Sequence, residues 1–370
     1  MSRRLRVAVL MGGRSSEHAI SVASGRSVLA ALDPSRYEAS TIEIGRDGTW
    51  ELGAGLRGSE PQALAPAREA TLELESGARG GVSSSEPQSP SAATLPVPGD
   101  PTSAAASLAD VDVVLPILHG PFGEDGTVQG LLELANVPYV GAGVAASAVN
   151  MDKDLAKAVL RARGIPVTRS VTIREGDPLD HPFDYPVFIK PARLGSSVGI
   201  TKVRSPEQLE PAVAVARQHD EKVLIEEFVD GKEVECGVLG NRQPIASLPG
   251  EIVAHGFAGE DWYDFSAKYD EGGMDLIVPP KIDQATIARV QEISVDAFVA
   301  TECEGMARVD CFVTRDGDVL VNELNTIPGF TPTSVYAKLF EESGIPYPEL
   351  LDRLIELAVE RHERRSRLKY

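Results

Sequence analysis

Short apolar runs alternate with helical periodicity over the first 50 residues. Residues 7–11 form an apolar run that predicts a buried strand, and a Gly-rich turn and a helix follow it. A second strand is predicted at residues 40–44. Alternation of strand and helix is typical of a parallel α/β sheet. The inner face of the predicted helix is expected to carry Ile20, Ala23, Ser27, Val28 and Ala31.

The regular pattern is lost between about residues 53 and 108, which are rich in Ser, Pro, Gly and Ala. Such a composition is typical of a segment without a packed core, so we expect a surface insertion. Order returns with a buried strand at 111–118 and a helix at 127–135. A short strand near Tyr139 then closes the N-terminal unit, which is expected to end near Gly141.

The remainder of the chain reads as a helix followed by antiparallel-looking strands. The helix is expected at 152–163 and ends at Gly164, before Pro166. A long helix buries Ile287, Val290 and neighbouring apolar positions. The other predicted elements are strands at 187–190, 198–203, 223–227, 233–239, 244–252, 305–314 and 319–323, a helix at 205–217, and a final helix from Pro348 with Leu351, Leu354 and Ala358 inward.

Composition narrows the class of protein. The 370 residues include 36 basic and 55 acidic side chains, a net charge of −19, which argues against a nucleic-acid or anionic-membrane binder. Cys236, Cys303 and Cys311 match neither a disulfide framework nor a Cys-x-x-Cys metal site. We see neither a signal peptide nor an apolar run of the roughly 18 residues that a membrane helix needs. A cytoplasmic, soluble protein is expected.

Two turns at the ends of predicted strands are candidate ligand sites. The turn Gly12-Gly-Arg-Ser-Ser-Glu-His18 precedes a helix, where free backbone amides favour an anion. A tight turn capped by a serine explains it equally well, and Glu17 could pair with the helix dipole or with a ligand ammonium. The segment His119-Gly-Pro-Phe-Gly-Glu-Asp-Gly126 lies at a strand's carboxyl end, where open α/β sheets bind ligands. For His119, a role in binding a ligand is therefore favoured over a purely structural role.

The most informative segment runs from Val187 to Gly199. Lys190 closes an apolar strand and is followed by a loop that contains Gly195, Ser196, Ser197 and Gly199. An ammonium at that position can bind phosphate, while the amides and hydroxyls of the loop fold over the same group. A simple hairpin is less favoured, because an unpaired lysine at the end of a buried strand is costly.

Two acidic groups follow other predicted strands. Glu226 and Glu227 fit equally well as protection of a strand edge and as acceptors for an adenine and a ribose. Arg308 and Asp310 share one face of a strand, and Glu323 and Asn325 share one face of the next. If these strands pair through the turn at 315–317, the four side chains converge. Their oxygen atoms then suit Mg²⁺, whereas a plain Arg308–Asp310 salt bridge leaves Glu323 uncompensated.

The motifs, taken in order, resemble the D-alanine–D-alanine ligase family of the ATP-grasp superfamily. The resemblance covers nearly the whole chain outside the insertion. It is carried by Gly12-Gly-Arg-Ser-Ser-Glu17, His119-Gly-x-x-Gly-Glu-Asp-Gly126, Met151-Asp-Lys153, Lys190-Pro-x-x-x-Gly-Ser-Ser-Val-Gly199, Ala267-Lys-Tyr269, Arg308-x-Asp310 and Glu323-x-Asn325-Thr-x-Pro-Gly329.

The resemblance implies an N-terminal α/β (pre-ATP-grasp) domain at 1–141 followed by a two-subdomain ATP-grasp fold. The central subdomain is expected at 142–226 and the C-terminal one at 227–370, with an Ω-type lid at 259–273. It also implies ATP-dependent joining of two D-alanine molecules through an acyl phosphate, for the synthesis of peptidoglycan precursors. A homodimer is implied. A D-alanine–D-lactate or D-alanine–D-serine ligase, or a non-catalytic nucleotide-binding protein of this fold, is the alternative.

The resemblance also assigns roles to individual residues. ATP is implied to contact Lys153, Lys190, Ser197 and Lys268 through its phosphates, and Glu226 and Glu233 through adenine and ribose. Two Mg²⁺, or Mn²⁺, are implied on Asp310, Glu323 and Asn325. The first D-alanine is implied to lie on Glu17, with Ser196 and Tyr269 in a hydrogen-bonded network and His119 nearby; Arg308 and the Gly329 amide would stabilise the tetrahedral intermediate, and Ser334 and Val335 would hold the second D-alanine.

Four positions modify this picture. Glu227 stands where many members of the family carry lysine, and Val335 where many carry leucine. Lys268-Tyr269 favours an amine nucleophile, because relatives that accept D-lactate tend to replace this pair. The departures at Glu227 and Val335 do not affect the expected reaction.

Replacing Tyr269 by phenylalanine tests the lid. We expect the Tyr269→Phe variant to ligate more slowly with little change in the KM for ATP, because the lost hydroxyl serves closure of the lid and not nucleotide binding. Steady-state kinetics with ATP varied at saturating D-alanine measures both quantities. An unchanged rate would contradict the role given to Tyr269.

Overall fold

The computed structural model describes residues 3–53, 108, 110–254 and 274–369. Its N-terminal sheet has the strand order β3-β2-β1-β4. Strand β1 pairs in parallel with both β2 and β4, which confirms the predicted parallel α/β sheet, and β3 adds an antiparallel edge. The strands are β1 (Leu5–Gly12), β2 (Tyr37–Ile44), β3 (Trp50–Gly53) and β4 (Val113–Ile117). The predicted insertion lies almost entirely outside the described residues.

Helix α1 (His18–Ala31) buries Val28 as predicted, but the rest of its buried face differs from the prediction. Its buried residues are Ser21, Ser24, Gly25 and Val28, whereas Ala23 is exposed. This face needs small residues because the helix lies very close to the sheet. A Cβ atom on Gly25 would lie 2.7 Å from the Met11 sulfur. The Ser21 hydroxyl is hydrogen-bonded there, since it donates to the Ile117 carbonyl and accepts from the Gly12 N–H.

Two further helices follow β4 in the described residues. They are α3 (Thr127–Leu134), close to the predicted bounds, and α4 (Val144–Met151), which the sequence pattern did not reveal. The strand expected near Tyr139 is reduced to a single parallel bridge between Tyr139 and Val114.

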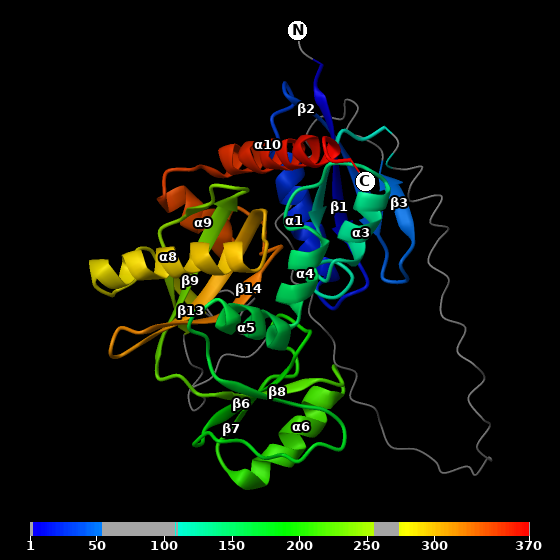
Figure 1. The fold of residues 1–370 in the computed structure, drawn as a ribbon. Coiled ribbons are helices and arrows are strands. Elements are labelled where there is room, and N and C mark those ends of the chain that lie inside the picture. Colours follow the sequence, from blue (N-terminus) through cyan, green and yellow to red (C-terminus); the bar gives the residue numbers. More distant parts are fainter. Residues whose placement is uncertain (1–2, 54–107, 109, 255–273, 370) are drawn as a thin grey trace, which may run out of the picture.

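A second, fully antiparallel sheet lies at the bottom of Figure 1, with the order β5-β8-β6-β7. Helix α5 lies between this sheet and the C-terminal one in that view, and Asp152 caps it by accepting the Leu155 N–H. The elements are α5 (Lys153–Ala162), β5 (Ser170–Ile173), β6 (Val187–Pro191), β7 (Thr201–Val203), the 3₁₀ turn η1 (Pro206–Gln208), α6 (Leu209–Arg217) and β8 (Val223–Glu227).

The C-terminal sheet has the order β12-β11-β9-β13-β14, with β10 paired to β9. The single strand predicted at 244–252 is wrong, because the chain there forms two short strands separated by residues 247–249. Helix α8 buries Ile287, Val290, Ile293 and Ala297 as predicted. The elements are β9 (Gly231–Gly240), β10 (Ile245–Ala246), β11 (Gly250–Ala254), β12 (Met274–Ile277), α8 (Gln284–Ala300), β13 (Gly305–Thr314), β14 (Val319–Asn325), α9 (Val335–Glu342) and α10 (Tyr347–Ser366).

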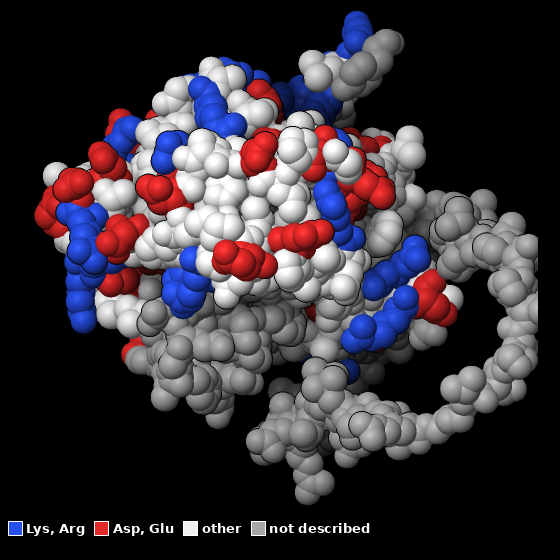
Figure 2. Space-filling model, turned by 90° about the horizontal axis from the view of Figure 1, so that it is seen from below, with Lys and Arg blue, Asp and Glu red and all other residues white. Residues whose placement is uncertain are grey.

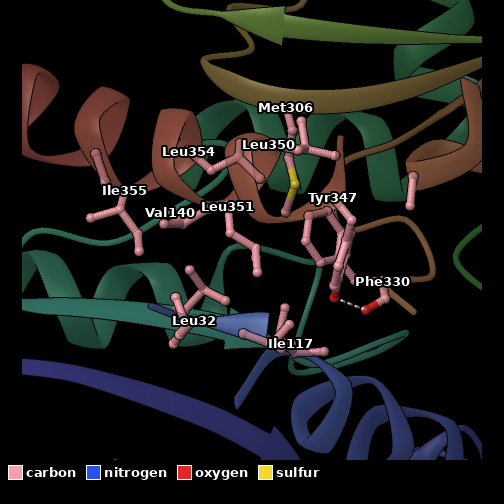
Figure 3. Packing of buried hydrophobic residues seen from close by; sticks show 14 of the residues in the cluster. Leu32, Ile117, Val140, Met306, Phe330, Tyr347, Leu350, Leu351, Leu354 and Ile355 are labelled. Carbon is pink, nitrogen blue, oxygen red and sulfur yellow. Dashed lines mark hydrogen bonds between the residues drawn. The ribbon is translucent and has the colours of Figure 1, made fainter. Parts of the chain in front are cut away.

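Helix α10 joins the two ends of the chain through one hydrophobic core. Leu350, Leu351 and Leu354 are fully buried in a cluster that also contains residues of β1, β4 and β13. Figure 3 shows these leucines beside Ile117 of β4 and Met306 of β13, with the Tyr347 hydroxyl donating to the Phe330 carbonyl at 2.8 Å. The core therefore fixes the loop around Phe330 relative to the N-terminal sheet.

The surface carries both signs of charge. On the face drawn in Figure 2, acidic and basic side chains are interspersed among uncharged ones. The three cysteines are free and buried. In the part of the chain that the structure describes, no helix is long and apolar enough to cross a membrane.

Truncating Leu351 tests the importance of this core. Leu351→Ala should lower the free energy of unfolding by about 2–5 kcal/mol, because it leaves a cavity where α10 meets the N-terminal sheet. Leu134→Ala is the control, since Leu134 is 89% exposed, and it should change stability by about 0.5 kcal/mol or less. Urea titration followed by circular dichroism measures both. Equal effects of the two substitutions would contradict this description of the core.

Candidate active site

A row of charged side chains crosses the C-terminal sheet. In the antiparallel register, Asp310 of β13 lies opposite Glu235 of β9 on one side and Glu323 of β14 on the other. Arg308 lies opposite Asn325, and the register shifts between Asp310 and Cys311. The predicted pairing of the two strands, and the convergence of their polar side chains, is therefore confirmed.

Arg308 is held by two carboxylates. Its guanidinium donates to both oxygens of Asp310, at 2.7 and 2.8 Å, and its Nε lies 3.0 Å from Glu235 Oε2. Burial alone would lower the pKa of Arg308, but Asp310 and Glu235 raise it well above its usual value. The site therefore contains a permanent, fixed positive charge. Glu235 was missed in the sequence, although the two-residue period of a strand places it on the same face as Glu233.

Helix α5 and strand β6 supply lysines that reach the C-terminal sheet. Lys153, the first residue of α5, lies 3.0 Å from Glu323 Oε2 and donates to the Leu194 carbonyl at 2.9 Å. The expectation that an Arg308–Asp310 pair would leave Glu323 uncompensated is therefore wrong, because Lys153 of α5 compensates it. Lys190 lies 3.4 Å from Asn322 Oδ1 and contacts Glu226.

Lys157 is a buried lysine that the sequence analysis missed. It contacts the same Glu226 carboxylate as Lys190 does, from helix α5. Burial alone would raise the pKa of Glu226, but the two lysines more than offset this and lower it to about 2. Its position four residues after Lys153, one turn along the helix, was the available signal.

The Gly-rich turn after β1 and the loop after β6 meet at Glu17. The Ser196 hydroxyl donates to Glu17 Oε1, which brings these two predicted site residues together. Ser196 and Ser197 have φ angles of 56° and 58°, in the left-handed region that non-glycine residues rarely adopt. Such strain at two consecutive residues is typical of loops shaped for a ligand. Lys268 and Tyr269, with the rest of the predicted lid, lie outside the described residues.

His119 is buried directly after β4. Its Nδ1 lies 3.0 Å from the Ile327 carbonyl, which requires Nδ1 to carry the proton. Burial lowers the pKa of His119, so the ring is neutral at physiological pH. The Nε2 atom is therefore an acceptor, and it has no hydrogen-bond partner among the residues that the structure describes.

Glu124 binds the backbone N–H of Ile327, the residue whose carbonyl contacts His119. It accepts the Gly120 N–H at 2.8 Å and the Ile327 N–H at 3.0 Å, one on each carboxylate oxygen. His119 and Glu124 together form a clamp, which we call the Ile327 clamp, between the N-terminal domain and the segment after β14. Glu124 stood inside the recognised 119–126 motif but was given no role in the sequence analysis.

The segment beyond the clamp ends at the first turn of α9. Ser334 is the residue before the helix, and its hydroxyl accepts the Thr331 N–H at 2.9 Å. A Cβ atom on Gly329 would lie 3.3 Å from that hydroxyl, so the predicted residues Gly329, Ser334 and Val335 share one small region. The N-terminus of a helix favours a carboxylate. Glu233 lies farther along β9, opposite Phe312.

The residues predicted to bind magnesium contain suitable donors. Asp310 is buried, Glu323 lies opposite it in the register, and Asn325 lies opposite Arg308, two residues along the strand. In the structure, Asn325 Nδ2 donates to Asp310 at 2.9 Å. The amide must therefore flip before its oxygen can share a cation with Asp310. Within residues 3–53, 110–254 and 274–369, no group of three or more His, Cys, Asp or Glu side chains is arranged to hold a metal ion. One amide and two carboxylates form the predicted set.

Two antiparallel sheets whose lysines and carboxylates meet in a buried site, beside a parallel α/β domain, define an ATP-grasp enzyme. Residues 6–142 match the family described as D-ala D-ala ligase N-terminus, and residues 146–356 match D-ala D-ala ligase C-terminus. The chain belongs to the D-alanine–D-alanine ligase family and is a ligase.

Individual relatives agree with this assignment over their full length. The chain is 47% identical to a D-alanine–D-alanine ligase of Nocardia farcinica, over 98% of this chain and 99% of the relative. The structure of the D-alanine–D-alanine ligase from Coxiella burnetii is similar with a TM-score of 0.77 and 34% identity, covering 99% and 97% of the two chains. The VanG D-Ala:D-Ser ligase from Enterococcus faecalis is similar with a TM-score of 0.77 and 31% identity, covering 96% and 100%.

Substitution of Glu124 tests the Ile327 clamp. Burial and the nearby Glu17 raise the pKa of Glu124 to about 8, but each of its two oxygens still accepts one N–H. A glutamine offers only one acceptor oxygen, so one buried N–H loses its partner at a cost of about 1–3 kcal/mol. If the loss falls on the transition state, Glu124→Gln lowers kcat/KM by roughly tenfold to 100-fold. The exposed Glu38, 3.8 Å from Arg4, gives the control Glu38→Gln, which should keep full activity. A Glu124→Gln enzyme with unchanged kcat/KM would show that the clamp does not position the site.

Proposed function

We propose that the chain joins two D-alanine molecules through an acyl phosphate, with conversion of ATP to ADP and phosphate, and so supplies a precursor of peptidoglycan. The observation that carries this proposal is the fixed Arg308 cation beside Asp310 and Glu323, faced by Lys153 and Lys190 of the other subdomain. Phosphoryl transfer needs positive charge on the phosphates, and acyl transfer needs positive charge on the developing oxyanion. The site offers both.

For ATP, we propose that the phosphates lie on Lys153, Lys190 and Lys268 and under the loop that contains Ser197. The turn at Ser196 and Ser197 supports this, because successive N–H groups in a turn form an anion-binding concavity. Glu233 and the end of β8 at Glu226 are proposed to hold the ribose and adenine. The Glu226 carboxylate itself is occupied by Lys157 and Lys190.

For the metal, we propose Asp310, Glu323 and Asn325 as ligands of two Mg²⁺, which Mn²⁺ can replace. Their oxygen donors suit these ions. Such cations supply charge neutralisation of the phosphates during transfer. Arg308 orients Asp310, because both carboxylate oxygens accept from the guanidinium.

For the amino acids, we propose that Glu17 binds the ammonium of the first D-alanine, supported by Ser196 and Tyr269. The neutral His119 presents its Nε2 near this substrate. This atom can accept a hydrogen bond from the substrate, but the ring does not carry a positive charge. Arg308 and the Gly329 amide are proposed to stabilise the tetrahedral intermediate. Ser334 and Val335, at the start of α9, are proposed to hold the carboxylate of the second D-alanine.

We propose further that the functional units are residues 1–141, 142–226 and 227–370, and that the enzyme acts as a homodimer in the cytoplasm. The three buried free thiols support a reducing compartment, and burial raises the pKa of Cys236 to about 11, which keeps it protonated and unreactive. The dimer follows from the family resemblance.

Phosphate release with defined acceptors tests the function. The chain, ATP and Mg²⁺ are incubated with D-alanine, L-alanine, D-lactate plus D-alanine, D-serine plus D-alanine, or no amino acid, and the products are identified by mass. We expect release that depends on D-alanine and yields the D-alanyl-D-alanine dipeptide. A mixed product formed in preference to the dipeptide would assign the chain to the D-serine or D-lactate type, and no release with any acceptor would contradict ligase activity.

A further inference from the structure

Lys157 is a buried charge that the proposed mechanism does not use. It lies on α5, is 1% exposed, and contacts the Glu226 carboxylate and the Thr168 hydroxyl. A lysine is almost never fully buried unless it is paired. Its partner, however, is already paired, because the other Glu226 oxygen contacts Lys190.

We call these three side chains the Lys157–Glu226–Lys190 triad. Lys190 lies closer to the C-terminal sheet than Lys157 does. Lys157 and Thr168 hold Glu226 Oε2, and Lys190 holds Oε1. Lys190 extends further toward the C-terminal subdomain, where its Nζ lies 3.4 Å from Asn322 Oδ1, beside Glu323. Lys157 thus lies behind the carboxylate, and Lys190 lies in front of it.

The charge of the triad is the important quantity. Two lysines and one carboxylate carry a net charge of +1 in a region from which water is largely excluded. Electrostatic interactions are strong there, so the excess charge attracts an anion. If Lys157 were absent, Glu226 would neutralise Lys190 alone as a one-to-one pair, and the excess would disappear.

We propose that Lys157 is a positioning residue that neutralises Glu226 from behind and thereby leaves the charge of Lys190 available to the phosphates of ATP. The inference rests on the proposed function in one respect, the binding of phosphate by Lys190. It adds a residue that never touches the nucleotide, yet sets its affinity. Burial lowers the pKa of Lys157 to about 8, which still leaves it mostly charged at pH 7.

The test measures phosphate affinity separately from recognition of adenine. The dissociation constants of inorganic tripolyphosphate and of ATP are determined by calorimetry for the full chain and for Lys157→Met, and kcat is measured at saturating ATP. We expect both ligands to bind Lys157→Met at least tenfold more weakly, while kcat changes by less than threefold. Unchanged tripolyphosphate affinity would overturn the proposal.

A double variant separates charge from structure. In Lys157→Met/Glu226→Gln, Lys190 has no acidic partner left in the triad, so its charge is no longer neutralised and tripolyphosphate should bind within about threefold of the parent chain. If the double variant binds as weakly as Lys157→Met, Lys157 acts only through the structure, and the proposal is wrong. Should Lys157→Met fail to fold, Glu226→Gln decides: it raises the charge of the triad and must not weaken tripolyphosphate binding.

Lys190→Met distinguishes failure of this inference from failure of the function beneath it. If Lys190→Met binds tripolyphosphate as the parent chain does, Lys190 is not a phosphate ligand and the assignment in the proposed function fails. If Lys190→Met binds weakly but Lys157→Met does not, only the inference about Lys157 fails. Formation of the dipeptide by the parent chain is independent of both outcomes.

Discussion

The register of strand β13 is the constraint on which the site depends. Because β13 lies between β9 and β14, one residue, Asp310, is flanked by carboxylates from both neighbours, and Arg308 is drawn into the same row. A shift of the register by one residue would turn all these side chains to the opposite face of the sheet, which packs in the core. The apolar alternation of β13, with Val309, Cys311 and Val313 buried on that other face, therefore also fixes where the charges lie.

So many buried charges are tolerated only because separate parts of the chain balance one another. Glu323 is balanced by Lys153 from α5, Asp310 and Glu235 by Arg308, and Glu226 by two lysines. Unpaired buried charges are strongly destabilising. The balance ties the two sheets together, and the Ile327 clamp ties both to the N-terminal domain. In this way the core packing around α10 is linked to the geometry at which phosphate and acyl groups would react.

The sequence predicted what depends on local pattern, and it failed where long-range packing decides. The strands β6, β8 and β13 were placed almost to the residue, because their apolar runs are bounded by charges or glycine. Most of the buried face of α1 was assigned wrongly, because close approach to the sheet selects serine and glycine over larger apolar residues. Lys157 and Glu235 were missed for a related reason: a charged residue in a helix or strand is normally exposed, and only the fold shows that each has a buried partner.

The central claim is that the carboxylate of one amino acid attacks the terminal phosphate of ATP, and the amine of a second then displaces that phosphate. Transfer of oxygen tests it most directly. With D-alanine labelled by ¹⁸O at both carboxylate oxygens, mass spectrometry of the released phosphate should find one ¹⁸O atom per phosphate for every dipeptide formed, because the bridging oxygen leaves with phosphorus. Phosphate free of ¹⁸O, released in step with the dipeptide, would contradict an acyl phosphate and with it the roles proposed for the site.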